Sequence, residues 1–128
     1  MYSKDLKYTE THEWVKVDRG FVTVGITDFA TKQLTDLVYV ELPMIGEKVT
    51  RGSSLGVIES VKAVSDLYSP VSGTIVEVNE KLSKEPEIVT QDPYGEGWMI
   101  KIKIEDPAEL DTLMDSEEYE DLVRKEKK

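Results

Sequence analysis

Apolar and polar residues alternate with a period of two along most of this chain, which is the pattern of half-buried β-strands. Residues 14–17 and 21–26 alternate on either side of a polar break at residues 18–20, and this arrangement predicts a β-hairpin. Residues 98–104 form the clearest predicted strand, with even-numbered apolar residues on one face and odd-numbered residues on the other. Residues 37–42 are almost continuously apolar, which predicts a strand buried on both faces.

The period changes to that of a helix at two places. A short early helix is predicted to begin at Thr27-Asp28, where either side chain can cap its first turn. A second helical region follows Asp106, with Pro107 in its first turn and apolar residues at helical spacing up to Val123. The pattern therefore predicts a β-rich barrel or sandwich with one early helix and a C-terminal helical tail.

Length and composition narrow the class of protein. A chain of 128 residues with 39% hydrophobic and 33% charged residues fits one globular domain, which we expect to span residues 1–128. The formal net charge of −10 disfavours nucleic acid as a partner and favours docking on basic protein surfaces. No apolar segment is long enough to span a membrane, and the first residues resemble neither a secretory signal nor a transit peptide, so we expect a cytoplasmic protein.

The chain offers few side chains for catalysis. It has no cysteine, which excludes disulfides, thiolate nucleophiles and cysteine metal ligands. His12 is the only histidine, and one histidine without cysteine cannot form a usual zinc site, so a surface or capping contact is the expected role. A stand-alone enzyme is therefore the weakest interpretation.

The stretch from residue 55 to residue 68 reads as two short strands that meet at a tight polar turn, with Lys62 at or beside its tip. Gly46 and Gly73 lie in turn-like contexts on either side of this hairpin. A lysine at such a tip is accessible to a modifying enzyme, although most surface lysines contribute only charge.

The segment Glu59-Ser60-Val61-Lys62-Ala63 resembles the H protein of the glycine cleavage system, within the larger group of lipoyl- and biotinyl-carrier domains. Further segments resemble the same family in the same order, so that the resemblance covers roughly residues 6–123. These segments are residues 8–15, 24–30, 40–43, 92–98 and 107–113. The resemblance implies a mainly β, flattened barrel-sandwich hybrid of the lipoyl/biotinyl-carrier type.

The resemblance also implies a function. Lys62 would carry lipoic acid in amide linkage, and the chain would act as a non-catalytic carrier and as a monomer. The lipoyl arm would accept the aminomethyl group of glycine at the P protein (glycine decarboxylase), deliver it to the T protein (aminomethyltransferase) and be reoxidised by the L protein (dihydrolipoyl dehydrogenase). A lipoylating enzyme would attach the cofactor, and Glu59 is either a recognition residue for that enzyme or a solvated charge.

The resemblance further implies that the loaded arm folds back near Thr11, Glu13 and Asp66. A carboxylate can pair with the ammonium group of the load, and a hydroxyl can add a hydrogen bond. The family often has serine at the position of Thr11, and threonine keeps the hydroxyl. The alternative is that Glu13 and Asp66 are ordinary solvated acids. Two other functions stay open. One is a carrier that donates lipoyl groups to 2-oxoacid dehydrogenases or is an H-like paralogue in an organism without glycine cleavage. The other is an interaction module whose Lys62 is never modified.

Overall fold

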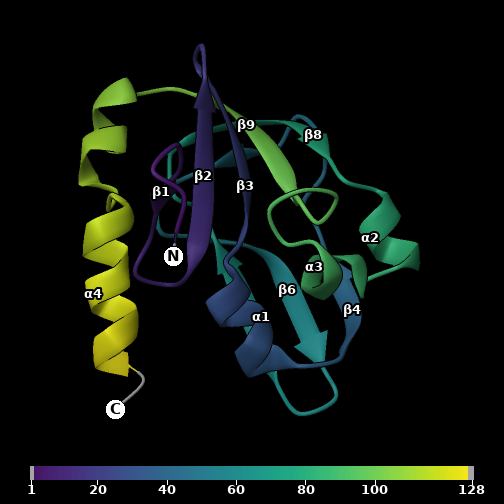
Figure 1. Ribbon diagram of the computed structural model, residues 1–128. Helices are drawn as coiled ribbons and strands as arrows, with labels where there is room; N and C mark the ends of the chain where they lie inside the picture. The colour runs from purple at the N-terminus through teal and green to yellow at the C-terminus, as the bar shows by residue number, and fades with distance from the viewer. Residues whose placement is uncertain (1, 127–128) are drawn as a thin grey trace.

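Two antiparallel sheets form the body of the protein in a computed structural model that describes residues 2–126 (Figure 1). The larger sheet has the strand order β1-β2-β3-β9-β8-β5. Its strands are β1 (Lys7–Tyr8), β2 (Glu13–Asp18), β3 (Phe21–Ile26), β9 (Ile100–Ile104), β8 (Gly73–Val78) and β5 (Lys48–Val49). The smaller sheet has the order β4-β6-β7, with β4 (Leu37–Glu41), β6 (Ser54–Ser60) and β7 (Val64–Tyr68). Neither sheet closes on itself, in agreement with the predicted barrel-sandwich fold.

Short helices connect or cover the strands (Figure 1). They are α1 (Asp28–Leu34), α2 (Lys81–Lys84), α3 (Ile88–Gln91), the 3-10 helix η1 (Pro107–Thr112) and α4 (Ser116–Glu126). Thr27 caps α1 as predicted, because its hydroxyl accepts a hydrogen bond from the backbone N–H of Ala30. Asp106 likewise caps η1, with Pro107 in the first turn. The early helix and the helical tail are both confirmed.

The predicted hairpin of β2 and β3 is also confirmed. Arg19 and Gly20 form its two-residue turn, and both have positive φ values, 49° and 84°. This is the type I′ geometry, whose twist matches that of the flanking strands.

Neighbouring residues of β2 point to opposite faces of the larger sheet and so enter different apolar clusters. Val15 belongs to the main core, which lies between the two sheets together with Ile58 and Ile102. Trp14 belongs to a second cluster, in which Tyr119 of α4 packs on the other face. Figure 1 shows α4 running alongside β1, so the helical tail packs on the strands as expected.

Two predictions on burial are wrong. β4 is an edge strand that buries only one face: Leu37 and Val40 are buried, whereas Val38 and Tyr39 are 57% and 44% exposed. The alternation of the last strand predicts Met99 on its polar face, yet Met99 is fully buried, because β9 begins only at Ile100 and the alternation does not extend back to residue 99.

Among the described residues, no helix is long and apolar enough to cross a membrane.

Candidate functional site

Lys62 lies in the turn that joins β6 to β7, as the sequence predicts. The two strands pair antiparallel, and Glu59 and Val64 are the last paired residues before the turn. Lys62 is exposed, and its Nζ makes no hydrogen bond or ion pair with any residue between 2 and 126. The side chain therefore projects from the tip with its amine accessible.

Ser60 holds this turn through both its backbone and its hydroxyl. Its N–H donates to the carbonyl of Ala63 (2.8 Å), and its Oγ accepts from the N–H groups of Lys62 (3.3 Å) and Ala63 (3.0 Å). The N–H of Val61 donates to the carbonyl of Asp36 (3.1 Å), which ties the turn to the residue before β4. The backbone that carries Lys62 is thus fixed while its side chain remains free in solvent.

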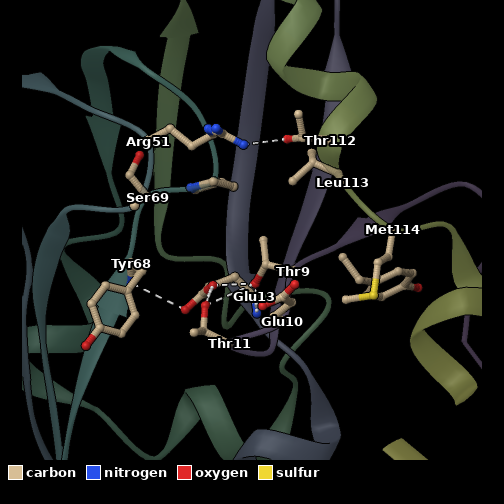
Figure 2. A pocket seen from close by; sticks show the side chains of 13 residues that line it. Thr9, Glu10, Thr11, Glu13, Arg51, Tyr68, Ser69, Thr112, Leu113 and Met114 are labelled. Carbon is tan, nitrogen blue, oxygen red and sulfur yellow. Dashed lines mark hydrogen bonds between the residues drawn. The ribbon is translucent and has the colours of Figure 1, made fainter. Parts of the chain in front are cut away.

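A second tight turn presents Glu13 at the beginning of β2 (Figure 2). The N–H of Thr9 donates to the carbonyl of Glu13 (3.0 Å), and the N–H of Glu13 donates to Thr9 Oγ1 (3.0 Å). The hydroxyls of Thr9 (2.5 Å) and Thr11 both donate to Glu13 Oε1. Glu13 Oε2 accepts from the backbone N–H of Tyr68 at the end of β7 (3.3 Å).

Glu13 is only 1% exposed, and burial raises the pKa of its carboxyl above the ordinary value of 4.5. Removal from water disfavours the charged form, whereas hydrogen bonds from Thr11, Thr9 and Tyr68 favour it and partly oppose that rise. No lysine or arginine makes an ion pair with Glu13 among residues 2–126. The site therefore holds a buried carboxyl group without a lysine or arginine partner among residues 2–126, and the charge interaction with His12 adds to the effects that lower its pKa.

Glu13 lies in the wall of a cavity of about 490 Å³. The cavity is lined by residues 8–11, Glu13, residues 51–52, residues 68–70 and residues 112–114. Figure 2 shows Glu13 and Thr11 on one side of it and Arg51 and Thr112 on the other, where Arg51 Nη1 donates to Thr112 Oγ1 (3.0 Å). Leu113 and Met114 add apolar surface, so the cavity combines an acidic end with an apolar wall.

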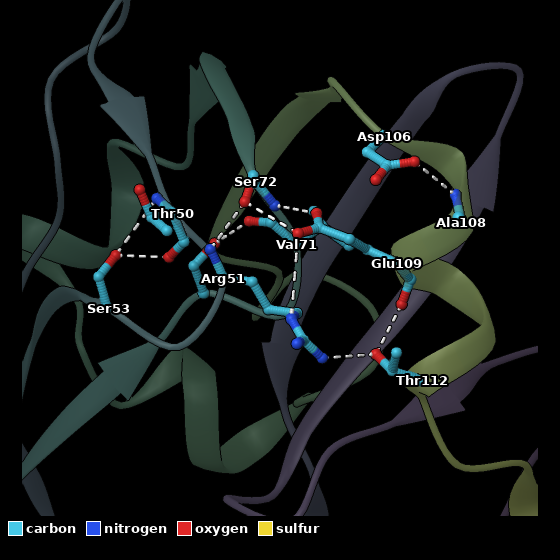
Figure 3. A network of polar contacts seen from close by, with 10 residues as sticks. Thr50, Arg51, Ser53, Val71, Ser72, Asp106, Ala108, Glu109 and Thr112 are labelled. Atoms are coloured by element: carbon cyan, nitrogen blue, oxygen red, sulfur yellow. Dashed lines mark hydrogen bonds and ion pairs between the residues drawn. The ribbon is translucent and has the colours of Figure 1, made fainter.

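A polar network fixes the wall that contains Arg51 and Thr112 (Figure 3). Glu109 of η1 accepts hydrogen bonds from the N–H (2.6 Å) and the hydroxyl (3.0 Å) of Ser72. Ser72 Oγ in turn accepts from the N–H of Arg51 (3.0 Å), and the guanidinium of Arg51 lies 3.9 Å from Glu109 Oε2. The 3-10 helix is thereby attached to the loops beside β5 and β8.

The structure brings together only part of the predicted site. Thr11 and Glu13 share one hydrogen bond and one cavity. Asp66 does not line that cavity; it is exposed on β7, and its Oδ1 accepts from Ser54 Oγ (3.2 Å). It lies between Lys62 and Tyr68 along the chain, on the strand that connects the lysine to the cavity.

Sequence reasoning missed three residues of the site. The spacing of Thr9 and Glu13 in a polar turn was a local signal that could have indicated their hydrogen bond. Arg51 and Tyr68 offered no such signal, because they reach the cavity only through the folding of distant segments.

Comparisons with known proteins show the family of the chain and support its fold. A family model described as "Glycine cleavage H-protein" matches residues 6–126. A glycine cleavage system H protein of Carboxydothermus hydrogenoformans is 56% identical over 123 residues, covering 96% of this chain and 95% of that protein. A probable glycine cleavage system H protein of Aeropyrum pernix is 55% identical over 124 residues, covering 97% of this chain and 87% of that protein. The crystal structure of a glycine cleavage system H protein from Mycobacterium marinum superposes with a TM-score of 0.81 at 40% identity, covering 92% of this chain and 95% of that one.

Proposed function

We propose that this protein, which belongs to the glycine cleavage H-protein family, is the lipoyl carrier of a glycine cleavage system. In this proposal, residues 1–128 form one carrier domain without catalytic activity of its own, and Lys62 is the attachment site. The observation that carries the proposal is the exposed, unpaired Lys62 amine on a turn whose backbone Ser60 holds in place.

The residues around Lys62 fit a covalently attached lipoyl group. A lysine must lose its proton to form an amide, and its unperturbed pKa is near 10.4, so the amine has to reach into the active site of the lipoylating enzyme. An exposed turn with no side-chain partner for Nζ allows that. When attached, lipoic acid supplies the dithiolane that accepts the aminomethyl group of glycine and the dithiol that is later reoxidised.

Thr11 and Glu13 suit the cationic amine of such a load. The Thr11 hydroxyl donates its proton to Glu13, so it presents only lone pairs to the cavity. Glu13 Oε2 accepts from one N–H donor, and a carboxylate oxygen has a second lone pair that can accept another. Two acceptors, one of them charged, can bind an ammonium group, and the apolar wall near Leu113 and Met114 can cover the aliphatic part of an arm.

Asp66 has a different place in the proposal. It is exposed on β7 between Lys62 and Tyr68, outside the cavity. We infer a contact along the path of the arm from the turn to the cavity. An ion pair between Asp66 and the load would be exposed to water, where ion pairs stabilise little. Glu13 is therefore expected to contribute more than Asp66 to holding the load.

The proposed partners are the P, T and L proteins and the lipoylating enzyme, with the chain acting as a monomer. Glu41 and Asp66 pair with Val57 in one row across the smaller sheet, and Glu59 lies in the next row on the same face. This acidic face lies beside Lys62 and would favour partners with basic surfaces. The cytoplasm is the proposed location, because the relatives above come from bacteria and an archaeon.

The experiment is intact mass measurement with peptide mapping on protein purified from its own host. We expect one lipoamide on Lys62. An unmodified mass, in cells that lipoylate other proteins, would instead favour the interaction module. Reconstitution with the P, T and L proteins, comparing the native chain with Lys62→Arg, then separates glycine cleavage from donation of lipoyl groups to other complexes.

A further inference from the structure

We propose that His12 is a positioning residue for the carboxylate of Glu13, and that α4 holds His12 in this role. The inference deepens the proposed function and rests on it in one respect, namely that Glu13 contacts the loaded arm. The only histidine of the chain has no other assigned purpose, and it directly precedes Glu13.

The backbone of His12 determines the direction in which Glu13 leaves the turn. His12 has φ = 71°, in the left-handed region that side chains other than glycine rarely adopt. Its N–H donates to the carbonyl of Thr9 (3.2 Å), and its carbonyl accepts from the N–H of Thr27 (3.0 Å). A return of this residue to negative φ would redirect β2 and move the Glu13 carboxylate away from Thr9 and Thr11.

The side chain of His12 is held by α4. Nδ1 lies 2.8 Å from the hydroxyl of Tyr119, and Nε2 lies 3.1 Å from Glu126 Oε1. The ring also packs against Phe29, with centroids 4.9 Å apart, and the side chain is only 12% exposed. Tyr119 is itself fully buried, and its hydroxyl is shared with Thr27 (2.7 Å). The helix therefore fixes the ring of a residue whose backbone is strained.

The same C-terminal segment fixes the other end of the turn. Tyr8 and Met114 exchange two backbone hydrogen bonds of 2.9 and 2.8 Å. The turn of residues 9–13 is thus anchored at the preceding Tyr8 by Met114 and at His12, within the turn, by Tyr119. The turn so held presents Glu13 to the cavity. The described residues of α4 do not line the cavity, so the helix acts on Glu13 through His12.

Amide hydrogen exchange on the unlipoylated protein tests this directly. Tyr119→Phe keeps the ring and its packing but removes the hydroxyl that holds His12. We expect the N–H groups of Thr9 and Tyr68, which bond to the backbone and the carboxylate of Glu13, to exchange at least tenfold faster. The amides of β9 should keep their native rates apart from any change in global stability. Ile75→Val changes the main core and not the second cluster, which contains the His12 neighbours Phe29 and Tyr119, so it supplies the control for a purely global loss of stability.

The outcomes separate a positioning role from a structural one. Selective acceleration at Thr9 and Tyr68 in Tyr119→Phe, absent in Ile75→Val, supports the proposal. Equal acceleration across β9, or native rates at both amides, overturns it. If Tyr119→Phe does not fold, Glu126→Ala removes the second contact of His12 from an exposed position, and the same selective pattern, smaller in size, is expected.

A second readout links the inference to the proposed function. In lipoylated protein with a loaded arm, Tyr119→Phe should speed release of the load by hydrolysis in the same direction as Glu13→Gln. If Glu13→Gln itself leaves that rate unchanged, the arm contact in the proposed function is wrong. The exchange result decides the positioning of Glu13 in either case, because it requires no lipoyl group.

Discussion

Glu13 Oε2 accepts a hydrogen bond of 3.3 Å from the backbone N–H of Tyr68, a residue 55 positions later in the chain. Glu13 begins β2 of the larger sheet, whereas Tyr68 ends β7 of the smaller one. β7 starts two residues after Lys62. This hydrogen bond therefore joins the strand that leads away from the lysine to the turn that holds the buried carboxylate.

The raised pKa of Glu13 predicts a specific dependence of stability on pH. Its folded-state pKa lies above the unfolded value, so the folded protein binds more protons between the two values, and this group's contribution to stability falls as pH rises through that interval. Glu13→Gln cannot ionise and should lack this fall. The measurement is the free energy of unfolding by urea from pH 4 to pH 8, compared between the native chain and the variant.

Glu10→Gln provides the matched control for that series. Glu10 lies in the same turn but is exposed, so its replacement removes one charge without removing a buried one. The difference between native chain and Glu13→Gln should change with pH, whereas the difference for Glu10→Gln should change much less. If the free energy of unfolding depends on pH in the same way in both variants, ionisation of the buried Glu13 does not affect folding stability.

Replacement of Thr11 tests its hydroxyl. Thr11→Val removes one of the two hydroxyl donors to Glu13 and the acceptor proposed for a cationic load, while Thr11→Ser keeps the hydroxyl. Since a hydrogen bond to a charged group contributes about 1.5–3 kcal/mol, release of the load should be on the order of tenfold faster in Thr11→Val. The rate of that release, measured on isolated protein, should be near native in Thr11→Ser. Equal release rates in Thr11→Val and Thr11→Ser would show that the Thr11 hydroxyl does not retain the load.

The turn at Lys62 depends on Ser60. Ser60→Ala removes the acceptor for the N–H groups of Lys62 and Ala63, which should cost about 1 kcal/mol and loosen the backbone that presents the lysine. We expect slower modification of the isolated chain by a lipoylating enzyme, followed by intact mass over time. Ser53→Ala, which removes a serine from another turn, should leave that rate unchanged. If Ser60→Ala is modified at the native rate, exposure of Lys62 is sufficient for modification and the ordered turn is not required.

Gly73 is required for the approach of two backbones. A Cβ at this position would lie 2.0 Å from the carbonyl oxygen of Lys103, across the pairing of β8 and β9. Gly73→Ala should therefore lower the free energy of unfolding by roughly 2 kcal/mol or more. Gly20→Asn is the control: Gly20 has φ = 84°, a Cβ added there would meet no other atom within 4 Å, and asparagine tolerates such φ values. The decrease in the free energy of unfolding for Gly20→Asn, measured from the same denaturation curves, should be clearly smaller than that for Gly73→Ala.

The sequence identified Gly73 as a turn residue, but its role differs. Gly73 begins β8, and glycine is needed there because a side chain would collide with the backbone of β9. Gly46, predicted in the same way, does adopt a positive φ of 95° in a turn. A glycine in a sequence cannot distinguish the two roles, because one depends on local dihedral angles and the other on a strand that pairs from elsewhere.

Local signals were sufficient for most of the secondary structure. The β2–β3 hairpin, β9, the Lys62 turn and the caps at Thr27 and Asp106 all depend on residues close together in the chain. α3 was not predicted, since its four residues are too few for a helical period to be recognised. The exposure of Val38 and Tyr39 was also not predictable, because an apolar run does not reveal whether both faces of its sheet are covered by other elements.

By itself, then, the sequence determined a β-rich fold and a lysine at the tip of a hairpin, since both follow from alternation and turn chemistry over a few residues. Tertiary structure alone decided that Glu13 is buried, that Tyr68 and Arg51 share its cavity, and that α4 holds His12. Each of these depends on segments that are dozens of residues apart and meet only when the two sheets pack or when α4 packs on the outer face of the larger sheet. Burial, and hydrogen bonds between distant segments, are properties of that packing, and no local pattern encodes them.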